Sequence, residues 1–102
     1  MKPSLTPYRN GISQLCRAHH VRKLDLFGSA RGQDLPPASS DVDFLVEFAD
    51  LPATDYARHY FALREALVTL LGREVDLVVE RAIRNRFFRA SVNRTREPIF
   101  AA

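Results

Sequence analysis

The sequence predicts a small α/β or α+β domain in which helices flank a single β-sheet. Two observations support this class. Helical and strand-like patterns alternate along the 102 residues, and 46% of these residues are apolar, which is enough to bury a core. Because a chain of this length has little room for a second core, we expect residues 1–102 to form one domain.

The first half of the chain is expected to contain a helix and two strands. Apolar residues at helical spacing predict a helix over residues 6–20. Apolar and polar residues alternate in residues 21–27, which predicts a strand that ends at Gly28. Residues 31–40 are rich in Gly, Pro, Ala and Ser and predict a loop. The nearly unbroken alternation in residues 42–48 predicts the second strand.

The second half is expected to contain the longest helix, a third strand and a last helix. Apolar residues at steps of three and four predict a helix over residues 53–71, with Gly72 as its C-terminal stop. An interrupted apolar run predicts a strand over residues 74–79. An arginine-rich helix is expected over residues 82–95, and it should end near Pro98.

The charge of the chain is carried mainly by arginine. The net charge is +3, and 13 of the 15 basic residues are arginines. Six of these lie near the C-terminus: Arg81, Arg84, Arg86, Arg89, Arg94 and Arg96. Arginine binds phosphates and carboxylates through forked contacts, so this cluster indicates a solvated face or a docking surface for an acidic partner. No nucleic-acid-binding motif accompanies the cluster, and we do not expect direct nucleic-acid binding.

The cysteine content and the length of the apolar runs argue against several classes of protein. The single cysteine, Cys16, cannot close an intrachain disulfide and is expected to be a small buried apolar residue. No run of about 18 apolar residues is present, and the N-terminus lacks the apolar stretch of a signal peptide. We therefore expect a cytoplasmic protein that does not associate with membranes.

Three acidic residues stand out because they interrupt otherwise apolar strands. Asp41 and Asp43 begin the second strand and, two residues apart, point to the same face of it, while Asp76 lies in the third strand. If the third strand lies beside the second, the three carboxylates meet and repel one another unless a cation neutralises them. Oxygen ligands suit Mg²⁺ or Mn²⁺, which carboxylates commonly hold together with substrate phosphates. The pattern therefore predicts a two-metal site for phosphoryl chemistry.

A phosphate-binding turn is expected directly after the first strand. Gly28 lets backbone N–H groups approach an anion closely, and the hydroxyl of Ser29 adds a donor at the start of a short helix. A Gly-Ser pair alone is weak support. Its position ahead of Asp41-x-Asp43, with Asp76 in a third strand, makes the combination specific.

Other polar residues have simpler interpretations. Asp25 is expected to pair with Lys23 or Arg22 on an exposed face, although it could face the site. The histidines His19, His20 and His59 have no partners at useful spacing, which favours surface or helix-end roles over catalysis.

These motifs resemble those of the minimal nucleotidyltransferases of the DNA polymerase β superfamily. The similarity rests on residues 26–32 (LFGSARG), 40–46 (SDVDFLV) and 73–78 (REVDLV) and extends over nearly the whole chain. It implies a polymerase β-like fold with a small mixed sheet and the order α-β-α-β-α-β-α. It also implies that Gly28 and Ser29 bind the nucleotide triphosphate, and that Asp41, Asp43 and Asp76 are the catalytic residues that bind two Mg²⁺ ions. Many relatives have an extra residue before the Arg-Gly dipeptide, so we assign no role to Arg31.

The short length, residues 40–48 (SDVDFLVEF) and the tail over residues 96–102 (REPIFAA) are similar to the antitoxin branch of that family, which is paired with toxins of the HEPN ribonuclease fold. This resemblance implies an adenylyltransferase that uses ATP and Mg²⁺ to transfer AMP to a toxin tyrosine, in a hetero-oligomer with that toxin. Two alternatives remain open. The protein could neutralise its partner by occlusion without catalysis, or it could transfer nucleotides to a small molecule or RNA.

Overall fold

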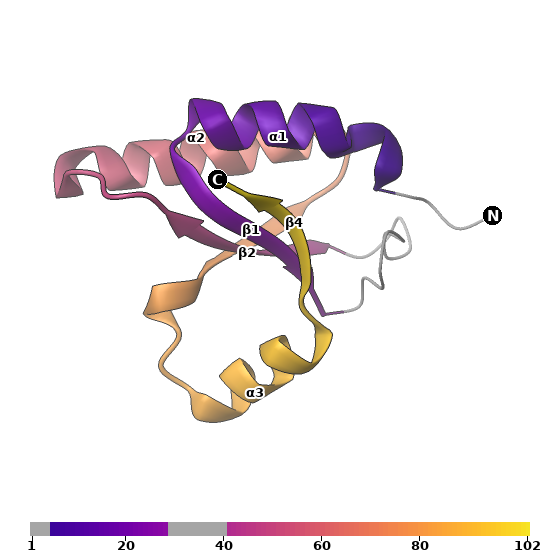
Figure 1. The fold of residues 1–102 in the computed structure, drawn as a ribbon, viewed down its shortest axis with the longest axis vertical. Helices are drawn as coiled ribbons and strands as arrows, with labels where there is room; N and C mark the ends of the chain where they lie inside the picture. The colour runs from indigo at the N-terminus through magenta and orange to yellow at the C-terminus, as the bar shows by residue number, and fades with distance from the viewer. Residues whose placement is uncertain (1–4, 29–40) are drawn as a thin grey trace.

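The computed structural model describes residues 5–28 and 41–102, which form a mixed four-stranded sheet with helices on both faces (Figure 1). In chain order the helices and strands are α1 (Arg9–Ala18), β1 (Val21–Phe27), β2 (Val42–Phe48), α2 (Ala53–Leu71), β3 (Val75–Val79), α3 (Arg86–Thr95) and β4 (Glu97–Ala101). Two 3₁₀ turns, η1 (Thr6–Tyr8) and η2 (Glu80–Ala82), precede α1 and follow β3. The predicted α+β class with one mixed sheet is confirmed.

The strands lie in the order β3-β2-β1-β4. β1 is antiparallel to both β2 and β4, whereas β2 and β3 are parallel and are joined by α2. A parallel pair needs such a crossover, because a short turn cannot bring the chain back to the same end of the sheet. β3 therefore lies beside β2, which is the condition on which the meeting of the three carboxylates depended.

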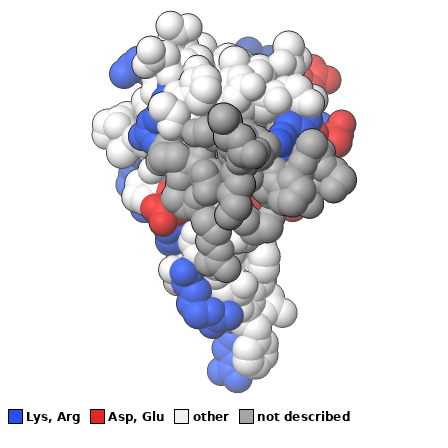
Figure 2. All heavy atoms as spheres, turned by 90° about the vertical axis from the view of Figure 1, so that its right-hand side faces the viewer, with Lys and Arg blue, Asp and Glu red and all other residues white. Residues whose placement is uncertain are grey.

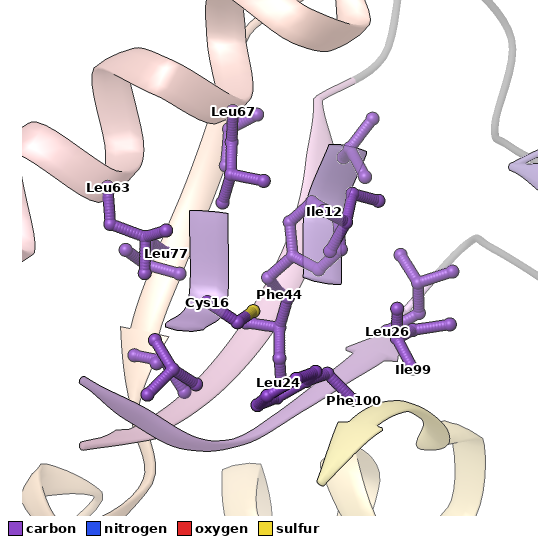
Figure 3. Close-up of a cluster of buried hydrophobic side chains, with 14 of the residues drawn as sticks. Ile12, Cys16, Leu24, Leu26, Phe44, Leu63, Leu67, Leu77, Ile99 and Phe100 are labelled. Carbon is purple, nitrogen blue, oxygen red and sulfur yellow. The ribbon is translucent and has the colours of Figure 1, made fainter. Parts of the chain in front are cut away.

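Helices α1 and α2 pack together on one face of the sheet and enclose the main core (Figures 1 and 3). Figure 3 shows side chains from both helices meeting side chains from all four strands, including Ile12, Cys16, Leu63, Leu67, Leu24, Leu26, Phe44, Leu77, Ile99 and Phe100. Cys16 is fully buried there, as expected, and burial raises the pKa of its thiol to about 12. Gly72 ends α2 in the left-handed conformation, as its position in the sequence predicted.

Helix α3 lies on the opposite face and covers only part of it (Figure 1). A second, smaller apolar cluster joins this helix to the sheet through Phe27, Leu45 and Val92. Side chains alternate along a strand, so the residues of β1, β2 and β3 that face α3 are those between the core residues. Asp43 and Asp76 belong to this set, and they lie on the face that α3 leaves partly open.

Two features of the C-terminal part differ from the sequence prediction. The last helix begins at Arg86 rather than near residue 82, because the side chain of Asn85 caps it by accepting hydrogen bonds from the amides of Phe87 and Phe88. The residues after this helix form β4, a strand that the sequence analysis did not predict. The resulting order has four strands rather than three. None of the helices within the described ranges combines the length and apolar character needed to cross a membrane.

Candidate active site

The parallel register of β2 and β3 brings two of the predicted acidic residues side by side. Asp43 and Asp76 are direct partners in this ladder, where neighbouring strands lie about 4.8 Å apart. Asp41 precedes β2 by one residue, and the two-residue period directs it to the same side of the sheet as Asp43. Three carboxylates that are separated by up to 35 positions in the chain therefore converge on one edge of the open face.

The electrostatics of Asp43 reflect this convergence. Its pKa is raised, first because the side chain is partly buried and then because of the negative charges of Asp76 and Asp41. Asp41 and Asp76 themselves are exposed. A cation near Asp43 would reduce this repulsion, so the electrostatics favour binding of positive charge.

The donor chemistry fits a hard divalent ion, because all three side chains offer carboxylate oxygens. Across residues 5–28 and 41–102, no three acidic, histidine or cysteine side chains are grouped so that they could hold a metal ion by themselves. Mg²⁺ is commonly held by one or two carboxylates together with substrate phosphates. The residues present are therefore compatible with an ion whose coordination the triphosphate completes.

Gly28 lies directly against the carboxylate of Asp43. Its neighbour Phe27 is paired with Asp43 across β1 and β2, and Gly28 itself adopts a φ of +79°, which favours glycine. A Cβ atom at this position would lie 2.5 Å from Oδ2 of Asp43. A larger residue would displace that carboxylate, so this turn has a steric as well as a conformational requirement for glycine.

The amide of Gly28 has a partner that sequence reasoning missed. It donates a hydrogen bond of 3.0 Å to Oγ1 of Thr95, the last residue of α3. The hydroxyl of Thr95 can in turn donate to the carbonyl oxygens of Ser91 and Val92 in the same helix. The end of α3 is thereby tied to the turn expected to receive phosphate. Ser29, the short helix expected after it and Arg31 lie outside the described residues.

Asp25 is not part of the acidic site, and its expected exposed position was wrong. Its side chain is only 1% exposed, and its Oδ2 accepts a hydrogen bond of 2.8 Å from Nε of Arg96 and lies 2.7 Å from Nη2 of the same guanidinium. Lys23 lies farther away, at 3.8 Å. Arg96 also binds Glu80 at 3.0 Å, and this hydrogen bond is the main reason that the pKa of Glu80 is lowered. The network fixes the end of α3 to the centre of the sheet.

The three histidines lie together, which the sequence analysis did not anticipate. The ring of His59 in α2 is 5.5 Å from that of His19 and 5.0 Å from that of His20, between ring centroids. The pKa of His19 is lowered by burial and by the charges of His59 and His20. All three lie at the turn after α1 and on α2, the helix that covers the other face of the sheet, so they do not contribute to the acidic site.

Comparison with known proteins decides the family. A sequence profile described as nucleotidyltransferase domain matches residues 9–98. The chain belongs to this family. A protein of Methanocaldococcus jannaschii that is assigned as a protein adenylyltransferase is 40% identical over 75 residues, which cover 72% of this chain and 71% of that protein. The predicted enzyme class, a nucleotidyltransferase, is thus confirmed, and the homology is to protein adenylyltransferases.

Solved structures agree with this assignment. A minimal nucleotidyltransferase superposes with a TM-score of 0.72 at 35% identity, covering 92% of this chain and 91% of that one. The fold also matches an antitoxin solved in complex with a tri-AMPylated HEPN toxin of Shewanella oneidensis, with a TM-score of 0.66 at 24% identity. That match covers 96% of this chain and 73% of the other. A further toxin–antitoxin complex of similar fold was solved with AMP-PNP (TM-score 0.63, 24% identity, 92% of this chain and 73% of that one).

Proposed function

We propose that this nucleotidyltransferase transfers AMP from ATP to a tyrosine hydroxyl of a HEPN-type ribonuclease toxin, and that it acts as the antitoxin of that toxin. The observation that carries the proposal is the pairing of Asp43 with Asp76 beside Asp41 and the Gly28 turn. The similarity to protein adenylyltransferases supports the choice of a protein as acceptor. The fold shared with antitoxins solved beside HEPN toxins supports the choice of partner.

The proposed roles are those that the family resemblance implies for these residues. Asp41 and Asp43 would hold two Mg²⁺ ions, or Mn²⁺ in their place, and Asp76 would hold the catalytic ion. When bound, these ions supply positive charge that activates the hydroxyl and steadies the leaving group. Gly28 and Ser29 would orient the triphosphate, with the amide of Gly28 exchanging the Thr95 hydroxyl for a phosphate oxygen.

The reaction itself is a displacement at phosphorus. The tyrosine oxygen bonds to the α-phosphorus of ATP, the bond from that phosphorus to the bridging oxygen breaks, and pyrophosphate leaves. In this proposal the carboxylate of Asp76 accepts the hydroxyl proton. In this reaction the partner protein supplies the acceptor hydroxyl.

The test is the mass of the toxin encoded beside this gene after co-expression with wild type, Asp43→Asn or Asp76→Asn. Wild type is expected to add AMP units to a tyrosine, and both variants are expected to slow this addition by at least about a hundredfold. Replacing a residue that only supports a metal ligand costs about 10–100-fold in activity, so loss of the ligand itself should cost more. Asp50→Asn, a matched change at an exposed aspartate after β2, should leave the modification intact.

Two outcomes would contradict the proposal. If an Asp41→Asn, Asp43→Asn double variant still neutralises the toxin without modifying it, the protein acts by occlusion. If wild type consumes ATP at an undiminished rate with a small molecule or RNA and leaves the toxin unmodified, the acceptor is not a protein.

A further inference from the structure

A groove of about 490 Å³ opens between β3 and the N-terminal end of α3, and the acidic site does not account for it. We call it the β3–α3 groove, and its walls include Tyr60, Leu77, Val78, Ile83, Asn85 and Phe88. Tyr60 donates its hydroxyl to the carbonyl oxygen of Leu77 at 2.6 Å. The hydroxyl on this wall is therefore already bonded within the chain, and the groove offers mainly apolar surface.

The groove begins where the acidic site ends. Val78 lies two residues after Asp76 in β3, on the same side of the strand, so the two side chains are about 7 Å apart along the sheet. A molecule seated in the groove would thus lie beside the position of the acceptor hydroxyl in the proposed reaction.

The exposed ring of Phe88 lines the groove, and the next ring along the chain, that of Phe87, is exposed as well. Phe88 is 41% exposed and Phe87 is 72% exposed, although both belong to the first turn of α3. Aromatic side chains are enriched at the centres of protein interfaces, where burial of their large apolar area stabilises a complex. The guanidinium of Arg86 lies over the ring of Phe87 at 5.1 Å, so an apolar and a cationic surface are adjacent.

The far end of the groove is strongly basic. Arg84 forms part of its wall, and no acidic residue occurs between Glu80 and Glu97. The carboxylate of Glu80 is already bound by Arg96 and lies 3.9 Å from Arg89. Figure 2 shows the basic side chains gathered over the lower end of the molecule, which α3 forms in Figure 1. Charge therefore changes sign along the groove, from the acidic site at Asp76 to the arginines.

This polarity selects one kind of occupant. An acidic group next to Asp76 would be repelled, whereas the same group near Arg84 and Arg86 would be attracted. A neutral hydroxyl suits the acidic end, an apolar side chain suits the middle and carboxylates suit the basic end. An extended peptide advances about 3.3 Å per residue, so about two residues separate the hydroxyl from the apolar side chain.

We propose that the β3–α3 groove docks the segment of the modified protein that carries the acceptor hydroxyl. That segment is extended, places an apolar side chain about two residues from its tyrosine in the groove, and directs acidic residues beyond it to Arg84 and Arg86. The inference rests on the proposed function for the meaning of the acceptor. Its test measures binding alone, so failure of AMP transfer and failure of docking give separate results.

The experiment titrates the protein into fluorescently labelled tyrosine peptides and follows their anisotropy. The first peptide is made in two versions, with leucine two residues before or two residues after the tyrosine and with glutamates beyond the leucine. The second peptide replaces leucine with serine, and the third replaces the glutamates with lysines. The first is expected to bind at least about tenfold more tightly than the other two, and less tightly as salt is raised.

Matched variants locate the binding. Phe88→Ala and Arg84→Glu should each weaken the first peptide by about tenfold or more. Phe61→Ala and Arg58→Glu change the same residue types at exposed positions of α2 and should leave it unchanged. Arg84 is exposed, so its replacement tests the proposal even if Phe88→Ala perturbs the packing of Phe88 against Phe27.

Two results would overturn the inference. If wild type does not bind the first peptide, this occupant is excluded. It is also excluded if the affinity changes neither with the leucine, nor with the glutamates, nor with Arg84→Glu. If instead Phe88→Ala weakens a non-hydrolysable ATP analogue and leaves the peptide unaffected, the groove holds the nucleotide base.

Discussion

The ion pair between Asp25 and Arg96 should be the most sensitive polar contact in the protein. The Asp25 side chain is 1% exposed, and its hydrogen bond and ion pair with Arg96 hold a charge that is otherwise removed from water. Replacing Arg96 with methionine keeps the apolar stem and removes the guanidinium. Because a buried charge is then left without its partner, the free energy of unfolding should fall steeply.

The size of this loss can be bounded from the contacts. Breaking a buried pair by removing one partner costs about 3–5 kcal/mol. Lys23, whose side chain is 42% exposed, remains 3.8 Å from Asp25 and offsets part of the loss. We therefore expect about 3 kcal/mol, a large fraction of the roughly 5–15 kcal/mol by which such domains are stable. Asp25→Leu should cost less, because Arg96 retains Glu80 and is 20% exposed.

Urea denaturation followed by circular dichroism measures these differences. The Asp25→Leu, Arg96→Met double variant should regain at least about 2 kcal/mol over Arg96→Met, since no buried charge remains. Arg22→Met is the control: it breaks an exposed pair with Glu47 and should change stability by under about 1 kcal/mol. The reasoning is refuted if Arg96→Met costs less than about 1 kcal/mol, or less than Asp25→Leu.

Three further predictions concern single titrating groups. The raised pKa of Asp43 means that its carboxylate destabilises the fold above its folded-state pKa and that this effect disappears as pH falls below about 3.9. Asp43→Asn should therefore raise the thermal midpoint at neutral pH without Mg²⁺, and an equal gain at low pH would contradict the electrostatic cause. The lowered pKa of His19 means that stability is lost as pH falls through about 6.5, the value in the unfolded chain. Chemical denaturation on both sides of this pH should show a smaller loss for His59→Asn, and an unchanged loss would exclude coupling between the rings. With a pKa of about 12 and no exposure, Cys16 should resist dithionitrobenzoate in the native protein and react at once in urea; rapid native reaction would show that the core opens.

Much of the site could be anticipated because it depends on local pattern and on one long-range step. The alternation in residues 42–48 fixes which face Asp43 occupies, and the same rule applies to Asp76. Only the pairing of β2 with β3 was needed to bring them together. The sequence analysis left that pairing as a condition, and the structure meets it with the long helix between the two strands, which is typical of a parallel crossover.

The missed features depend on contacts that no local pattern shows. β4 contains Pro98, which argues against a strand unless that strand lies at a sheet edge, and its pairing with β1 joins residues more than 70 positions apart. Asp25 interrupts an apolar run, and only the approach of Arg96 from the far end of the chain makes its burial tolerable. The start of α3, in contrast, carried a local signal, because Asn85 is a favourable N-cap residue.

The limited size of α3 explains why the acidic face can be both folded and open. Its apolar contact with the sheet is small, involving Phe27, Leu45 and Val92, and it ends in two polar ties, from Thr95 to Gly28 and from Arg96 to Asp25. A longer helix with a wider apolar face would cover the positions next to Asp43 and Asp76, where burial of unneutralised carboxylates is costly. A short helix held by polar ties positions the turn at Gly28 and leaves the acids accessible to cations. The buried Asp25–Arg96 pair thus substitutes for apolar area that this face of the sheet cannot use.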